Sequence, residues 1–186
     1  RKSFGFYHNL MGFPKVTVGE ISGYALGGGC EMAVYAAKRV AAMETYIGLV
    51  EVGVGLVPGA GGLTYIARRA AENMAASTSK DILPFLTEGF TAAAMAKVGT
   101  SALESRKLGY LLESDIVVAH KDELLFVAIN EAKALFVSGY RAPHALAHGA
   151  RGQGLSALCG TADALCSGGR VTIPSFRDRP RVVCDI

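Results

Sequence analysis

Three consecutive glycines, Gly27 to Gly29, are the feature that most restricts how this chain can fold. They follow a stretch rich in β-branched apolar residues at 14–23, which predicts a buried strand ending near Gly23. An alanine- and methionine-rich stretch follows and predicts a helix. Glycine costs conformational entropy, so a triplet between strand and helix indicates either a tight turn or a backbone that another group must approach closely. Amides at such a helix start can hold an anion or a carbonyl oxygen that gains negative charge.

The remaining pattern predicts a mixed α/β fold. The helix after the triplet is expected to run as far as Lys38 and Arg39, whose cations suit a helix C terminus. Residues 40–43 and 45–50 predict short strands, and the glycines of 53–62 predict a loop. Further helices are expected at 62–75, 81–95, 101–108 and 121–137, the last with Asp122 as its N-cap.

The two ends of the chain differ from its middle. Residues 1–13 have apolar side chains at helical spacing, and Pro14 ends that pattern. Residues 141–186 contain six Arg and no Lys, together with three of the four cysteines, and their periodicity is weak. We therefore divide the chain into a domain at 1–140 and a tail or helical extension at 141–186, whose origin the sequence leaves open and to which we assign no catalytic role.

Composition excludes several classes of protein. With 51% hydrophobic and 19% charged residues, the chain can bury a core and is not a disordered tail. Nineteen Lys and Arg against 16 Asp and Glu give a net charge of +3 without a basic stripe, so no nucleic-acid partner is expected. No apolar run reaches the roughly 18 residues of a membrane span, so no membrane partner is expected either.

The cysteines and histidines predict no metal site. Cys30 and the three later cysteines lack CxxC spacing and a histidine at zinc-ligand distance, which favours a reducing compartment, and we expect the cytoplasm. His144 and His148 are four residues apart, but the glutamate of an HExxH motif is missing.

Two glutamates are the candidate catalytic groups. Glu31 lies two residues past the triplet, in the first turn of the predicted helix and therefore beside whatever the glycine amides bind. Glu51 lies between two valines before a glycine-rich loop. Apolar surroundings can hold one proton between two carboxylates near neutral pH, as an acid and base pair requires. Helix capping by Glu31 and a salt bridge of Glu51 are the alternatives.

GYALGGGCE at 23–31, followed by GLVEVGVGLVPGAGG with Glu51, resembles the crotonase superfamily of enoyl-CoA hydratases and isomerases. The resemblance covers about residues 14–137, and Val50 stands where hydratases commonly have proline. The stretch 96–118 is similar to the family's helix, short loop and last core strand. These stretches are most similar in sequence to the hydratase domain of long 3-hydroxyacyl-CoA dehydrogenases of fatty-acid β-oxidation. The resemblance implies a crotonase-like ββα spiral with C-terminal helices.

The resemblance also implies roles for individual residues. The Gly28 amide would be one oxyanion donor to a thioester carbonyl, Gly27 and Gly59 would contact the acyl-CoA substrate, and Glu31 and Glu51 would activate a water. Family members that only isomerise often lack one acid, so both acids together favour hydration of trans-2-enoyl-CoA to 3-hydroxyacyl-CoA. Hydration needs no cofactor, and NAD would serve only a dehydrogenase part of a longer parent. Family members usually form trimers or pairs of trimers.

Two other functions are compatible with the same residues. An enoyl-CoA isomerase would use one principal acid and leave the other idle. The family's second oxyanion amide comes from a strand expected before Arg1, so the resemblance implies an N-terminally incomplete fold. A non-catalytic truncated domain is therefore the second alternative.

Overall fold

A computed structural model of the 186-residue chain describes residue 10 and residues 13–79 and 81–142. The expected helix at 1–13 lies almost wholly outside these residues. So do nearly all of the 141–186 segment, both candidate histidines and the three later cysteines.

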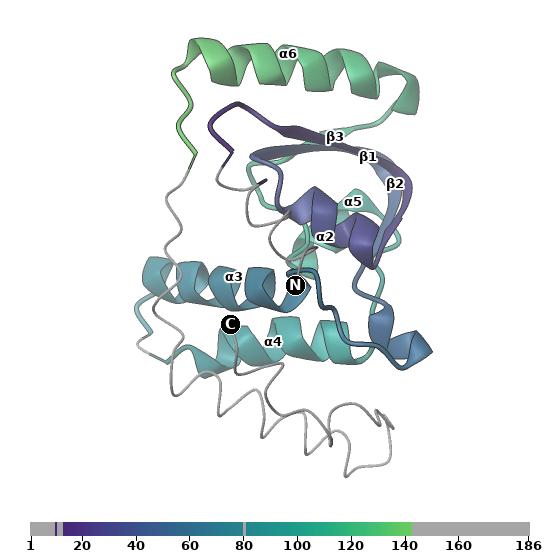
Figure 1. Ribbon diagram of the computed structural model, residues 1–186, viewed down its shortest axis with the longest axis vertical. Helices are drawn as coiled ribbons and strands as arrows, with labels where there is room; N and C mark the ends of the chain where they lie inside the picture. Colours follow the sequence, from purple (N-terminus) through teal and green to yellow (C-terminus); the bar gives the residue numbers. More distant parts are fainter. Residues whose placement is uncertain (1–9, 11–12, 80, 143–186) are drawn as a thin grey trace.

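The centre of the fold is a three-stranded parallel sheet with the order β1-β2-β3 (Figure 1). Its strands are β1 (Val18–Leu26), β2 (Lys38–Gly48) and β3 (Ile116–Val118). β1 was expected to end near Gly23, but it continues to Leu26. Gly23 adopts φ +62° at an irregularity in the pairing of β1 with β2, and the strand resumes its pairing after it. The two short strands expected after residue 39 form one strand, β2, of 11 residues.

Helices lie on both sides of the sheet. α6 (Leu124–Val137) covers one face, and α2 (Gly28–Val34) and α5 (Ala102–Lys107) lie on the other (Figure 1). Beyond α2, α3 (Gly62–Ala76) packs along α4 (Leu83–Ala94). The four helices expected after residue 61 are thereby confirmed. Short 3-10 turns, η1 (Glu51–Val54) and η2 (Lys121–Glu123), precede α3 and α6.

β2 divides the core because its side chains alternate between the faces of the sheet. Val40 and Ala42 pack with Leu124 in a small cluster beneath α6. Ala41, between them in sequence, joins Ile47 in the larger cluster. That larger core also includes buried residues of α2, α3, α4 and α5.

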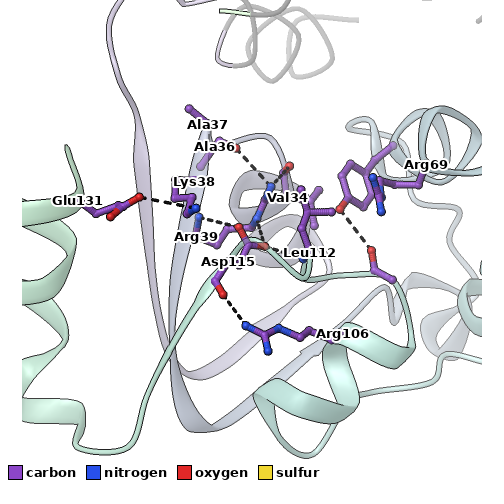
Figure 2. A network of polar contacts seen from close by, with 12 residues as sticks. Val34, Ala36, Ala37, Lys38, Arg39, Arg69, Arg106, Leu112, Asp115 and Glu131 are labelled. Carbon is purple, nitrogen blue, oxygen red and sulfur yellow. Dashed lines mark hydrogen bonds and ion pairs between the residues drawn. The ribbon is translucent and has the colours of Figure 1, made fainter. Parts of the chain in front are cut away.

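The end of α2 differs from the sequence expectation. The helix stops at Val34, and Lys38 and Arg39 begin β2 instead of closing a helix. Arg39 is buried: its Nε donates to Asp115 Oδ2 at 2.6 Å, and its Nη1 donates to the Val34 carbonyl at 2.9 Å (Figure 2). These partners for its charge allow Arg39 to lie inside the fold, whereas the sequence pattern predicted it at a helix C terminus.

Asp115 holds the approach to β3 against the sheet. Its Oδ2 also accepts from the Leu112 amide at 2.6 Å, and its carbonyl oxygen accepts from the Arg106 guanidinium (Figure 2).

The predicted N-cap of the last helix is wrong, since Asp122 lies in η2 and Glu123 takes the cap position of α6 without a side-chain bond. Of the described helices, none is both long and apolar enough to span a lipid bilayer.

Candidate active site

The glycine triplet forms the turn between β1 and α2. Gly27 is the N-cap of α2 with φ +54° and ψ −123°, a conformation that favours glycine, and its amide donates to the Gly48 carbonyl at 2.9 Å. That bond ties the turn to the end of β2. Gly28 is exposed and is the first residue of α2. The triplet therefore forms a tight turn, and the approach of a substrate group to its amides stays a prediction.

Glu31 is buried within the first turn of α2, with 2% of its surface exposed. Its Oε1 accepts hydrogen bonds from the Ala60 amide at 3.1 Å and from the Gly62 amide at 2.9 Å. Gly61 and Gly62 are the N-cap and first residue of α3, so the carboxylate supplies a partner for amides at the start of that helix. Glu31 thus caps a helix, but a different helix from the one that carries it.

Glu51 approaches the same turn from the end of β2. It is the first residue of η1, and its carbonyl oxygen accepts from the Leu56 amide at 2.9 Å. A Cβ atom placed on Gly27 would lie 3.3 Å from Glu51 Oε1, so this carboxylate lies directly against the β1–α2 turn. Its Oε2 is buried and has no hydrogen-bond partner in the described part of the chain, and the salt bridge considered for Glu51 is not found there.

The environment raises the pKa of both acids. Burial is the largest cause for Glu31, and the amides of Gly62, Ala60 and Gly61 partly oppose it. Burial also raises the pKa of Glu51, its own amide opposes this, and the negative charge of Glu31 raises it further. The two carboxylates therefore interact, and protonation of one makes ionisation of the other easier. Such a pair can give and take protons closer to neutral pH than ordinary carboxylates.

Cys30 precedes Glu31 in α2 and is fully buried. Burial and the charges of Glu51 and Glu31 raise the pKa of its thiol far above the usual range. The thiol therefore stays protonated and is not a nucleophile. Among residues 13–79 and 81–142, no group of three His, Cys, Asp or Glu side chains gathers as a metal site would require.

Four of the predicted site residues thus lie in or beside the turn between β1 and α2: Gly27, Gly28, Glu31 and Glu51. Gly59, the other predicted substrate contact, is exposed in the loop before α3, one residue before the Ala60 amide that binds Glu31.

Sequence reasoning overlooked Tyr35, whose hydroxyl donates to the Gly61 carbonyl at 2.8 Å. The signal was present, because Tyr35 follows Glu31 by four residues, a spacing that puts two side chains on one helix face.

Similar proteins point to one family. The family model described as Enoyl-CoA hydratase/isomerase matches residues 2–100. A Bacillus subtilis protein named "Probable 3-hydroxyacyl-CoA dehydrogenase" is 42% identical over 125 residues, which are 65% of this chain and 15% of the relative. A fatty acid oxidation complex subunit alpha of Idiomarina loihiensis is 35% identical over 133 residues, 72% of this chain and 16% of the relative. The chain thus spans only about a sixth of these relatives.

Solved structures agree on the fold. An enoyl-CoA hydratase from Bacillus anthracis has a TM-score of 0.52 at 19% identity, covering 98% of this chain and 58% of that one. One from Thermoplasma volcanium has a TM-score of 0.53 at 20% identity, covering 99% and 59%. The expected crotonase fold is therefore confirmed. By the family match over residues 2–100 and by this fold, the chain belongs to the enoyl-CoA hydratase/isomerase family.

Proposed function

We propose that the chain carries the hydratase site of a β-oxidation enzyme, which adds water in syn fashion to trans-2-enoyl-CoA and yields 3-hydroxyacyl-CoA. The observation that carries this proposal is the interacting pair of Glu31, in the first turn of α2, and Glu51, the first residue of η1, both with a raised pKa. Family membership supports the acyl-CoA substrate. No cofactor takes part, and NAD would belong to a separate dehydrogenase part of a longer protein.

In the proposed reaction, the two carboxyl groups hold one water. As the water oxygen bonds to C3, one carboxylate accepts a water proton, and the C2–C3 π electrons move into the thioester as an enolate. The Gly28 amide stabilises the negative oxygen, and the other carboxyl group delivers a proton to C2. Gly27 and Gly59 line the path of the acyl-CoA. Oε2 of Glu51, which has no partner among the residues that the structure describes, supports this proposal, because it is an acceptor that a bound water would satisfy.

The first prediction tests this mechanism with separate Glu31→Gln and Glu51→Gln variants of the full-length protein. Glutamine keeps the shape of the side chain but cannot exchange the proton, so kcat should fall about 10²- to 10⁴-fold in each variant. The assay follows loss of the conjugated double bond for trans-2-enoyl-CoA thioesters of several chain lengths. Binding of the thioester should be retained.

Glu113→Gln, on an exposed residue outside the site, is the control and should hydrate normally. Near-normal hydration by either site variant would contradict the two-acid mechanism. Double-bond isomerisation that survives in one variant would favour the isomerase alternative. A wild-type protein that binds acyl-CoA but transforms none would favour the non-catalytic domain.

Assembly and location complete the proposal. We propose a homotrimer or a pair of trimers, supported by family membership. We also propose a cytoplasmic location, supported by four cysteines that lack CxxC spacing.

A further inference from the structure

One peptide group lies between the hydroxyl of Tyr35 and the carboxylate of Glu31. Its carbonyl oxygen, that of Gly61, accepts from Tyr35 Oη at 2.8 Å. Its amide, that of Gly62, donates to Glu31 Oε1 at 2.9 Å. Because the carbonyl and the N–H belong to the same peptide group, the two bonds form one continuous chain from phenol to carboxylate.

Close packing holds this chain in place. Tyr35 and Glu31 are 5% and 2% exposed, and both come from α2 and its C-cap. A Cβ atom on Gly61 would lie 2.8 Å from Tyr35 Oη, and Gly61 has φ +128°, so only glycine brings its carbonyl to the hydroxyl without strain. A Cβ atom on Gly62 would lie 3.1 Å from Glu31 Oε1. Neighbouring side chains therefore crowd both residues of the peptide group.

Hydrogen bonds in series polarise one another, most effectively where water is excluded. A donor on the Gly61 carbonyl draws electron density toward that oxygen and makes the Gly62 N–H a stronger donor. A stronger donor favours an ionised acceptor. We propose that Tyr35 is a positioning residue for the hydration reaction, which strengthens the bond from the Gly62 amide to Glu31 and thereby favours the ionised form of that carboxyl group. The catalytic consequence rests on the proposed function; the chain of bonds does not.

The ionisation behaviour of the two side chains fits this role. Burial, together with the charge of Glu31, raises the pKa of Tyr35 to about 12, so its hydroxyl stays protonated and remains a donor at working pH. Burial raises the pKa of Glu31, and the Gly62 amide is the largest influence in the opposite direction. Tyr35 therefore acts on the contact that most counteracts the burial of Glu31.

Other ionisable groups surround the chain of bonds. Cys30 on α2 and Glu51 on η1 interact with Glu31. Arg68 and Tyr65 on α3 interact with Tyr35. All of them remain unchanged in a Tyr35→Phe variant, so a change in the titration of Glu31 can be assigned to the lost hydroxyl.

The second prediction has two readouts on Tyr35→Phe. NMR titration of the Glu31 carboxyl carbon, assigned by its absence in Glu31→Gln, should move to higher pH than in the wild type. The limb of the kcat/KM profile that reports Glu31 should move in the same direction with the plateau retained. One neutral hydrogen bond limits the effect to about 2- to 10-fold in kcat/KM on that limb. A purely structural role would lower kcat at every pH and leave the limb in place.

Tyr65→Phe is the matched control. It also removes a buried tyrosine hydroxyl, but that hydroxyl donates to the Gly109 carbonyl at 3.3 Å and not to the Gly61 carbonyl. The backbone amide of Tyr65, which donates to the Gly61 carbonyl at 2.9 Å, is kept in this variant. Its Glu31 titration should equal that of the wild type.

3-Fluorotyrosine at position 35 keeps the hydroxyl and makes it a stronger donor, so it should move both readouts to lower pH. This variant decides the question if Tyr35→Phe does not fold.

An unchanged Glu31 titration in folded Tyr35→Phe, or in the fluorotyrosine protein if only that one folds, would overturn the proposal. Equal shifts in Tyr65→Phe would also overturn it, because any lost hydroxyl would then suffice. Failure of the proposed function looks different: the wild type would hydrate no enoyl-CoA, while the NMR titrations would still respond to Tyr35 if the chain of bonds acts as proposed.

Discussion

At position 51, a carboxylate oxygen is buried without a hydrogen-bond partner among the described residues, whereas Glu31 accepts two amides through one oxygen. An unsatisfied buried acceptor costs about 1–3 kcal/mol of folding free energy. Gly27 leaves just enough room for Glu51, since a Cβ atom there would reach to 3.3 Å from Oε1. The site therefore combines one firmly held acid with one that has capacity for a further partner, as activation of a water requires.

The third prediction concerns Gly61→Ala. A methyl group would lie 2.8 Å from Tyr35 Oη, on a residue whose φ of +128° already excludes L side chains without strain. We expect a loss of about 1–3 kcal/mol in the free energy of unfolding, measured by urea denaturation. Gly29→Ala is the control, because open space surrounds its Cβ position and alanine favours helix α2. Equal stabilities of the two variants would contradict the crowding inferred at Gly61.

At the scale of elements, α2 is short, and contacts from other elements define both its ends. At its start, Gly27 bonds to the Gly48 carbonyl at the end of β2. At its end, Arg39 donates to the Val34 carbonyl and, at 3.3 Å, to the Ala36 carbonyl. Seven residues are too few for an isolated helix to be stable in water. Tertiary contacts therefore hold the helix that presents Glu31.

The fourth prediction concerns Asp115→Ala. It leaves the buried Arg39 guanidinium without its counter-ion, so the free energy of unfolding should fall by about 3–5 kcal/mol. Glu131→Ala is the control. It breaks the partly exposed ion pair between Glu131 Oε1 and Lys38 Nζ, which are 3.6 Å apart, and should lower the free energy of unfolding by at most about 1 kcal/mol. Chemical denaturation measures both values. Similar losses would show that burial of the Arg39–Asp115 pair does not distinguish it from a surface pair.

At the scale of the whole described fold, the sheet has a different role on each face. α6 covers one face over a small apolar cluster. The other face carries the larger core, and α2 packs on it (Figure 1). The carboxylate of Glu31 accepts from the Gly62 amide at the start of α3. Glu31 is buried on this side of the sheet, and Glu51 lies half-buried against the β1–α2 turn. That placement raises their pKa values, and it opposes stability whenever both are ionised.

The fifth prediction is the pH dependence of stability. The pKa of Glu51 is raised in the folded chain, so the folded state binds more protons than the unfolded state above about pH 4.5. Its contribution to stability is therefore present below that pH and is lost as the pH rises through the raised pKa. Glu51→Gln should unfold at higher urea concentration than the wild type at neutral pH, with a smaller difference at pH 4.

Glu72→Gln should change stability in the opposite direction. Hydrogen bonds from Arg68 and Arg69 lower the pKa of Glu72, although burial raises it. Its contribution is present above the ordinary pKa and lost in acid, so Glu72→Gln should be less stable at neutral pH, by about 1 kcal/mol or less for this surface group. A Glu51→Gln variant that follows the same direction as Glu72→Gln would contradict the effect of burial on Glu51.

The local features of the fold could be predicted from short stretches of sequence. β-Branched runs, a glycine triplet and apolar spacing at 3.6 residues predicted β1, the turn after it and the helices beyond residue 61. These features depend on neighbours along the chain, so they can be inferred without a fold. The candidate residues Gly28, Glu31 and Glu51 came from the same short motifs.

The contacts that these residues make depend on how distant parts of the chain pack together. Arg39 suited a helix end by local charge, yet a partner 76 positions later placed it inside β2. α6 carries apolar residues all round, and packing selected Leu124 and Ala128 for the core while Phe126 stayed 71% exposed. The peptide group between Tyr35 and Glu31 lies at the start of α3, with Gly61 26 positions after Tyr35 and Gly62 31 positions after Glu31. Such contacts depend on chain segments that meet only after folding, so no local pattern encodes them.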